Sequence, residues 1–451
     1  MTALRKLAIL LLVIAVGPLV GSAKADPVQE TMKSWLAANA NQGTIPPGTT
    51  ITMQNWQQYQ QYMPVGMIEF FKGTYFWKMP PDVSMPVGPT VILPLPKDYI
   101  AASEKYGSQT QVVHTPDGHM NVANYVAGMP FPNPSDPDKG YKILANVWFP
   151  GGPYLAVLST DSGLASFCTA DRFNNSACTR TSVVYRQLAY NWAPGVARTD
   201  PQASGAWFSE WLMVEQPEQS RYTADLTLFS QDLSKSEDSF VFVPSLRRSL
   251  RLSTSARCAP LFGSDMVHDD QRVGYNGGLS AFNAEYLGTR KILGLTDLTN
   301  ADGAWPANYD MPLGWSKPSW GPWSLREVDV IDVRRVPSEQ AGYCYGSKIM
   351  YVDHEFYHQL FEEIYDANMK LWKVVQIGLQ PATLVAGEEP APYGGGIIET
   401  YWDLQNDHVS HVFTANADGK TDGLRFDQNV APEYNNISRY STPSGLMQIM
   451  R

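Results

Sequence analysis

The second half of the chain alternates short apolar segments with polar turns. Segments 206–216 (AWFSEWLMVEQ) and 348–353 (KIMYVD) are rich in aromatic and β-branched residues, which favour strands. Turn sequences such as QPEQ and VPSEQAG separate segments of this kind. From about residue 180 onward, this regular pattern predicts a mostly β (α+β) protein with antiparallel strands.

Segment 220–230 (SRYTADLTLFS) shows the two-residue period of a strand most clearly. The apolar positions are Tyr222, Ala224, Leu226 and Leu228, and the polar positions are Arg221, Thr223, Asp225 and Thr227. We therefore expect a strand with one buried face and one face in water.

The N-terminal part has a different pattern. Prolines in TIPPGTT, MPPDVSMPVGPTVILPLPKD and GMPFPNPSDPDKG exclude long helices. Helices are expected at 50–72, where Thr50 can cap, and at 139–148. We interpret residues 26–150 as a segment that wraps the core, 151–451 as the β domain, and about 263–292 as a loop-like, partly helical insertion.

The first 25 residues have the organisation of a secretory signal peptide. Arg5 and Lys6 precede an apolar run from Leu7 to Val16, and Ala23-Lys24-Ala25 forms an A-x-A cleavage site. No later stretch approaches 18 consecutive apolar residues, so no membrane-spanning helix is expected. The predicted location is the periplasm.

Charge and cysteine content narrow the class of protein. The formal net charge is −10, and loss of Arg5, Lys6 and Lys24 with the signal peptide makes it more negative, which argues against nucleic acid as a partner. Four cysteines in an exported chain favour disulfides. Cys168 and Cys178 bracket a short polar loop and are paired on that ground, which leaves Cys258 with Cys344. Free thiols are the alternative.

Residues 354–358 (HEFYH) match the H-E-x-x-H pattern of zinc metalloproteases. A zinc hydrolase using His354, Glu355 and His358 would need these residues on a helix and a third ligand further along. The flanks favour strands instead, with a turn at Asp353–Tyr357 and a strand in HQLFEEIYD. We therefore treat the match as coincidental and expect no metal, cofactor or enzyme activity, with a zinc hydrolase as the alternative.

Two further groups of histidine and acidic residues were considered as metal sites. His408 and His411 are assigned to a turn and strand surface. His268, Asp265, Asp269 and Asp270 are assigned to a solvated acidic loop, because such loops are commoner than metal clusters.

Segment 351–374 (YVDHEFYHQLFEEIYDANMKLWKV) resembles the signature hairpin of the LolA/LolB fold. In its turn, Asn368 is expected to take a positive φ. The whole chain also resembles a family of exported bacterial proteins of unknown function. The matching segments are 125–134 (YVAGMPFPNP), SEWLMVEQPEQSRY with 240–253, 288–295, and 399–408 (ETYWDLQNDH).

The resemblance implies a curved, half-open antiparallel β-barrel with capping helices and an apolar interior for acyl chains or another hydrophobic ligand. LolA-like proteins carry lipoproteins across the periplasm, and the larger family implies partnership with an RND-type exporter and an outer-membrane protein. The leading hypothesis is therefore a periplasmic carrier of a hydrophobic or lipid-like molecule. A structural adapter without cargo is a further alternative.

A sheet that curves around a ligand cavity needs large apolar side chains, and no charge, on its concave side. The candidates on predicted strands are Trp207, Trp211, Met213, Tyr222, Leu226, Leu228, Phe240, Phe242, Leu250, Tyr351 and Trp372. The alternative for each is an ordinary place in the core. Arg247, Arg248 and Arg251 are candidates for an anionic headgroup or a partner's acidic patch, and a solvated strand face is their alternative.

Overall fold

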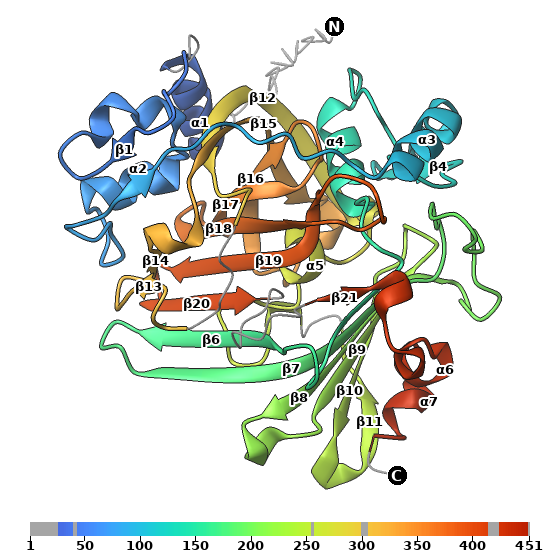
Figure 1. Ribbon diagram of the computed structural model, residues 1–451. Coiled ribbons are helices and arrows are strands. Elements are labelled where there is room, and N and C mark those ends of the chain that lie inside the picture. Colours follow the sequence, from blue (N-terminus) through green and yellow to red (C-terminus); the bar gives the residue numbers. More distant parts are fainter. Residues whose placement is uncertain (1–25, 39–42, 254–256, 299–304, 414–423, 450–451) are drawn as a thin grey trace, which may run out of the picture.

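A single large antiparallel sheet dominates the computed structural model, which describes residues 26–38, 43–253, 257–298, 305–413 and 424–449 (Figure 1). The predicted signal peptide lies outside the described residues. The sheet has 15 strands: β5 (Leu155–Leu158), β6 (Ala165–Asp171), β7 (Ser176–Gln187), β8 (Ala206–Gln216), β9 (Ala224–Ser230), β10 (Asp238–Val243), β11 (Arg248–Arg251), β12 (Phe282–Gly294), β15 (Ser324–Arg335), β16 (Tyr345–Asp353), β17 (Gln359–Asp366), β18 (Leu371–Ala382), β19 (Ala391–Asp403), β20 (His408–Phe413) and β21 (Arg425–Phe426).

The sheet consists of two meanders joined in the middle. Strands β6 to β11 follow one another outward to one edge, and the chain then crosses to β12 at the other edge and returns through β15 to β20. Strand β20 pairs antiparallel with β6, with Ser410 opposite Thr169. Strands β11 and β12 end the order without pairing with each other, so the sheet is open. The predicted mostly β, half-open antiparallel architecture is confirmed.

Residues 257–281, here called the crossing segment, lie inside the curve of the sheet. They include a short helix, α5 (Gln271–Gly274). Their hydrogen-bonding partners are Thr169 on β6, Glu210 on β8, Arg335 on β15, Lys348 on β16, Lys373 on β18 and Ser410 on β20. Because strands far apart in the sheet reach the same short segment, the sheet must curve around it.

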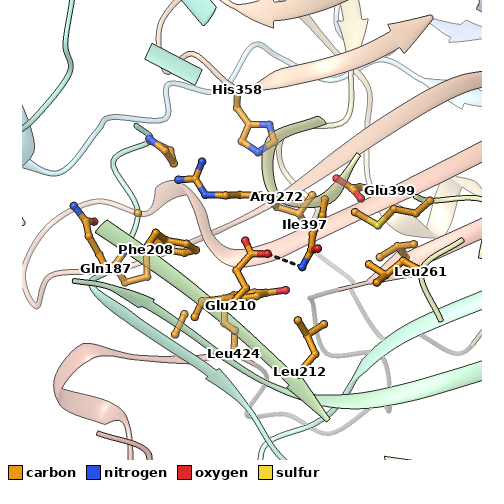
Figure 2. A pocket seen from close by; sticks show the side chains of 18 of the residues that line it. Gln187, Phe208, Glu210, Leu212, Leu261, Arg272, His358, Ile397, Glu399 and Leu424 are labelled. Carbon is orange, nitrogen blue, oxygen red and sulfur yellow. Dashed lines mark hydrogen bonds between the residues drawn. The ribbon is translucent and has the colours of Figure 1, made fainter. Parts of the chain in front are cut away.

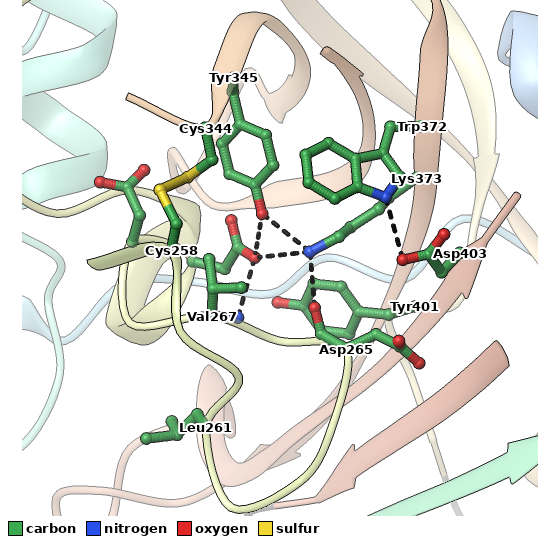
Figure 3. A network of polar contacts seen from close by, with 12 residues as sticks. Cys258, Leu261, Asp265, Val267, Cys344, Tyr345, Trp372, Lys373, Tyr401 and Asp403 are labelled. Carbon is green, nitrogen blue, oxygen red and sulfur yellow. Dashed lines mark hydrogen bonds and ion pairs between the residues drawn. A yellow bond between two sulfur atoms is a disulfide. The ribbon is translucent and has the colours of Figure 1, made fainter. Parts of the chain in front are cut away.

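Buried ion pairs fix the crossing segment to the sheet. Asp270 receives hydrogen bonds of 2.8 Å from Lys348 Nζ and from the Tyr345 hydroxyl. Lys373 Nζ donates to the same hydroxyl and to the carbonyl oxygen of Asp265 (Figure 3). Burial alone would raise the pKa of Asp270, but Lys348 and Lys373 lower it below its usual value.

The prediction that residues 265–270 form a solvated acidic loop is therefore wrong in part. Asp269 and Asp270 are fully buried, because Arg335, Lys348 and Lys373 supply the opposite charge. The expectation of a concave face without charge is wrong for the same reason, since these cations project from strands of the sheet.

The N-terminal helices are α1 (Pro27–Ala38), α2 (Val65–Lys72), α3 (Lys97–Tyr106) and α4 (Lys139–Trp148). Helices α1 and α2 pack on the face of the sheet opposite the crossing segment, whereas α4 packs against the crossing segment, where the Tyr275 hydroxyl donates to the carbonyl oxygen of Leu144. Met32 of α1 contacts the Tyr351 hydroxyl, and the backbone N–H of Gly66 in α2 donates to Glu363 Oε1 at 2.7 Å. The short pairs β1 (Thr50–Ile51) with β2 (Met85–Pro86) and β3 (Gln111–His114) with β4 (Met120–Ala123) belong to the same segment.

The C-terminal segment covers the outer face of the first meander. Helices α6 (Ile437–Tyr440) and α7 (Pro443–Leu446) lie beside β9 to β11 in Figure 1. Tyr440 packs edge-on against Trp211 of β8, with ring centroids 5.0 Å apart, and Ser441 bonds to Ser209 of the same strand. The small pair β13 (Tyr309–Asp310) and β14 (Trp315–Ser316) precedes β15.

Several local predictions can be compared with these bounds. The helix at 139–148 is confirmed as α4. Of the helix expected at 50–72, only Val65–Lys72 is α-helical, because Met63 before Pro64 is extended and Thr50 lies in β1. Trp56–Gln58 and Gln60–Tyr62 form short 3-10 helices before it. The insertion expected at 263–292 ends earlier, since residues 282–294 form β12.

The strand expected in 220–230 is present as β9, but the prediction that one of its faces lies in water is wrong. Asp225 and Thr227 are buried, and Thr227 Oγ1 bonds to both Asp225 and Ser239. Tyr222 lies outside the strand in the left-handed region, with φ 68°.

Both predicted disulfides are present. Cys168 and Cys178 lie directly opposite each other on β6 and β7. Cys258 joins Cys344, and so ties the start of the crossing segment to the start of β16. Among the described residues there is no helix long and apolar enough to cross a bilayer.

Substitution of Gly140 tests the contact between α4 and β12. A Cβ atom at this position would lie 2.3 Å from the carbonyl oxygen of Ala284 and 2.6 Å from Tyr286 N. We expect Gly140→Ala to lower the free energy of unfolding by about 1–3 kcal/mol in urea denaturation. Gly152→Ala is the control, because its Cβ would meet nothing within 4 Å. Equal stability of the two variants would contradict the close packing.

Candidate functional site

The HEFYH motif forms the turn between β16 and β17, as predicted, and not a helix. Asp353 Oδ1 accepts from the backbone N–H of Glu355 at 2.9 Å, and Arg326 holds the same carboxylate through two hydrogen bonds. His354 Nδ1 lies 2.8 Å from Asp329, whereas His358 is buried and bonds to the carbonyl oxygen of Gln359. These two histidines therefore have separate partners and do not share an ion.

No set of three or more His, Cys, Asp or Glu side chains in the described part of the chain is arranged to hold a metal. His411, which was expected on a strand surface, is fully buried. Its ring centroid lies 3.8 Å from that of Tyr309, and burial lowers its pKa to about 3.

A cavity of about 180 Å³ lies between the first meander, β19 and β20, and the crossing segment. Most of its wall is apolar, and the larger apolar side chains are Phe167, Tyr185, Leu212, Leu261, Ile397 and Val412. A smaller set of polar side chains also reaches it (Figure 2): Gln187, Glu210, Gln271, Arg272, His358 and Glu399. A mainly apolar wall with a few polar groups is the usual composition of a small-molecule site.

Glu210 is brought to the cavity by β8, on which Phe208 and Leu212 point the same way. Its carboxyl accepts a hydrogen bond of 2.6 Å from Gln271 Nε2 of the crossing segment. Burial raises the pKa of Glu210 to about 8, although Arg272 acts in the opposite direction. At neutral pH the Glu210 side chain is therefore mostly protonated.

Arg272 reaches the cavity from α5 of the crossing segment. Its Nη1 donates to the carbonyl oxygen of Trp148 at 2.8 Å. Burial lowers the pKa of Arg272 to about 10, so the guanidinium remains charged at neutral pH. Figure 2 shows Arg272 and Glu210 reaching toward the same part of the cavity, but the two groups do not form an ion pair.

The remaining titratable groups of the wall are neutral near pH 7. Burial raises the pKa of Glu399 to about 8 and lowers the pKa of His358 to about 4. Burial also raises the pKa of Tyr185 well above its usual value. Among the described residues that line the cavity, Arg272 is then the one that carries a charge.

Of the apolar residues predicted to line a cavity, only Trp207 lies on this wall, where β8 is irregular at its start. The others pack elsewhere. A cluster on the outer face, under the C-terminal segment, contains Trp211, Met213, Leu226, Leu228, Phe240 and Phe242. Tyr351 packs against Trp35 of α1, and Trp372 donates to Asp403. Tyr222 and Leu250 are half-buried near the outer hairpins.

The predicted headgroup arginines lie far from the cavity in the β10–β11 hairpin. Arg247, Arg248 and Arg251 are all exposed, and Arg251 pairs with Asp238 on the neighbouring strand. The structure therefore places them on a solvated surface, which was the alternative interpretation of these residues. In the turn after β17, where Asn368 was considered able to take a positive φ, the residue with positive φ is Met369, at 61°.

Sequence reasoning missed Glu210, Gln271, Arg272 and Glu399. Glu210 could have been noticed from its position at the centre of the aromatic strand AWFSEWLMVEQ. Burial of a carboxyl in an apolar strand costs free energy, so such a residue indicates a specific role. Arg272 stands close to the glycines of RVGYNGG, which indicate an unusual backbone but not where the side chain points.

The chain was compared with known proteins. A family model described as "Protein of unknown function (DUF1329)" matches residues 50–446, which confirms the predicted kind of family. No curated protein matches.

Solved structures similar to this chain include the following three. A DUF1329 family protein from Desulfovibrio piger is 13% identical, covers 68% of this chain and 100% of that chain, and has a TM-score of 0.44. An "outer membrane lipoprotein-sorting protein domain" from Vibrio parahaemolyticus is 14% identical, with coverage of 66% and 96% and a TM-score of 0.42. A LolA superfamily protein from Nitrosomonas europaea is 13% identical, with coverage of 62% and 88% and a TM-score of 0.33.

The raised pKa of Glu210 predicts a pH-dependent stability. The folded protein keeps a proton on Glu210 that the unfolded chain releases above about pH 4.5, so the stabilising effect is present at low pH and is lost as pH rises toward 8. Between pH 5 and pH 9, wild type should lose about 1–4 kcal/mol more unfolding free energy than Glu210→Gln. Urea denaturation at several pH values measures this, with exposed Glu339→Gln as the control. Parallel profiles for wild type and Glu210→Gln would contradict it.

The turn conformation of HEFYH predicts that these histidines form no zinc site. After incubation with zinc and removal of the excess, wild type, His354→Ala and the exposed-site control His114→Ala should contain the same amount of metal by elemental analysis. One equivalent of zinc in wild type that His354→Ala alone loses would support the hydrolase alternative.

Proposed function

Because this chain belongs to the DUF1329 family of proteins of unknown function, we propose its function from the cavity itself. The protein is a binding protein that carries a hydrophobic or lipid-like molecule. The observation that supports this is the mainly apolar cavity between the sheet and the crossing segment, formed by side chains such as Phe167, Leu212 and Leu261. Apolar surface of this kind is stabilised when an apolar ligand displaces water from it.

The polar groups of the cavity support a carrier rather than an enzyme. Glu210 is bonded to Gln271, and Glu399 accepts from Tyr401. In the part of the chain that the structure describes, neither carboxyl is hydrogen-bonded to a serine, cysteine or threonine that it could activate. A binding site needs only that such groups orient the ligand, whereas covalent catalysis needs a nucleophile within reach of a base.

The proposed place of action is the periplasm. Two disulfides persist in an oxidising compartment but are rare in the cytosol. We include exchange of the ligand with an RND-type exporter and an outer-membrane protein in the proposal, on the strength of the sequence resemblance. An adapter that carries no ligand is the competing function.

Ligand carriage can be tested by filling the cavity. Ala156 of β5 lies on the cavity wall, and a larger side chain there would occupy the space of the ligand. We expect Ala156→Phe to weaken binding of a neutral fluorescent apolar probe, N-phenyl-1-naphthylamine, by about 10-fold or more. Ala177→Phe, on an exposed position of β7, should bind as wild type does.

The same proteins should be examined by native mass spectrometry and solvent extraction after purification from the periplasm. Wild type and Ala177→Phe are expected to carry a lipid-like molecule that Ala156→Phe lacks. A folded wild type that carries nothing and does not bind the probe would support the adapter instead. Circular dichroism establishes that each variant is folded.

A further inference from the structure

Arg272 is a half-buried cation that faces the cavity without a carboxylate partner. No acidic side chain of the described residues lies within ion-pair distance of its guanidinium. Its Nη1 donates to the backbone of Trp148, and its Nε is buried and has no hydrogen-bonding partner. A buried polar group without a partner is costly, so this one requires an explanation.

Buried cations elsewhere in the protein are paired differently. Arg326 holds the carboxylate of Asp353 through two hydrogen bonds, and Lys348 contacts Asp270. These two cations have acidic partners, and the buried Arg186 is held by Asn435 and the carbonyl oxygen of Tyr434. At Arg272 the corresponding space is the cavity.

Four aromatic rings surround the guanidinium of Arg272. Its Cζ atom lies between 4.4 and 5.5 Å from the ring centroids of Trp148, Trp207, Phe208 and Phe229. Cation–π contacts of this kind stabilise the charge after it loses water. They also restrict the orientation of the guanidinium, so its free donors are preorganised for a ligand.

The backbone at this position is strained. Arg272 has φ 75°, in the left-handed region, whereas Gly274, Gly277 and Gly278 nearby reach positive φ without a Cβ. A non-glycine residue in this region costs stability and tends to occur at functional sites. The strain is explained if the arginine side chain itself is needed in the cavity.

Glu210 does not neutralise Arg272. It lies on the same part of the cavity but bonds to Gln271, and its burial favours the neutral form. An anion that enters the cavity would therefore meet one positive charge and no negative one on the described wall.

We propose that Arg272 binds the anionic head of the ligand, so that the ligand class is an amphiphile with a carboxylate or phosphate head and an apolar tail. This inference rests on the proposed function and specifies its ligand. The planar guanidinium donates to two oxygens of either head group. The tail lies along the apolar wall that includes Leu212, Leu261 and Val412.

The test uses three ligands with the same ten-carbon tail: undecanoate, decyl phosphate and neutral decanol. Undecanoate is the carboxylate of this set, because its carboxylate carbon is additional to the tail. Delipidated wild type should bind at least one of the two anions about 10-fold more tightly than decanol, measured by displacement of N-phenyl-1-naphthylamine. Comparison of undecanoate with decyl phosphate identifies the preferred head group.

Variants of Arg272 test whether its guanidinium causes the preference for the anionic ligands. Arg272→Gln should reduce the preference for the anion to less than about 2-fold while decanol binds as before. Arg272→Lys should keep part of it, because the charge remains but the two-pronged donor is lost. Arg186→Gln is the matched control, since Arg186 is a buried cation that has no ion-pair partner among the described residues and bonds to Asn435 on the other face of β7. It should retain the full preference.

The outcomes separate the two proposals. If decanol and the probe bind but neither anion is preferred, or if folded Arg272→Gln and Arg272→Lys both retain the preference, the headgroup role of Arg272 is wrong and the carrier function stands. If neither the probe nor any of the three ligands binds wild type, both proposals are wrong. Should Arg272→Gln fail to fold, Arg272→Lys decides the question.

Discussion

The pairing of Asp270 with Lys348 is the interaction on which the interior of this protein depends. Both groups are fully buried, and Tyr345, Lys373 and the backbone N–H of Val267 complete their contacts. Removal of one partner from such a pair leaves an uncompensated charge in a dry interior, which costs about 3–5 kcal/mol. These contacts fix the crossing segment, and the crossing segment forms one wall of the cavity. The position of the cavity wall thus follows from charges at some distance from the cavity.

The cavity combines contributions from two parts of the chain. The strands supply most of the apolar wall, since their inward positions alternate with outward ones. The crossing segment supplies Arg272 and Gln271, which no regular strand could present from the opposite side. An amphiphile needs both kinds of surface, one for its tail and one for its head. The arrangement is therefore consistent with the proposed binding of an amphiphile in a cavity that is mainly apolar but contains one charged side chain.

Much of the architecture could be predicted from local sequence, whereas the site could not. Strand β8, helix α4 and the turn at HEFYH depend on periodicity and turn residues within a few positions of one another. Which face of a strand lines the cavity depends on which distant segments of the chain cover each face of the sheet. Strand β8 is apolar on both faces, because residues near 440 cover the face that contains Trp211. Similarly, the environment of Arg272 is created by rings from α4, β8 and β9, which only the folded chain brings together.

The pairing of β6 with β20 also has a consequence for how the chain is made. Cys168 and His411 are neighbours in the sheet but are separated by most of the β domain in sequence. As synthesis proceeds from the N-terminus, the free edge of β6 stays open until the last strand of the second meander emerges. An open edge of this kind is a template for pairing with the wrong strand or with another chain. Nascent molecules are then most exposed to aggregation in the interval before β20 is available to pair with β6. The stability of the finished fold does not shorten this interval.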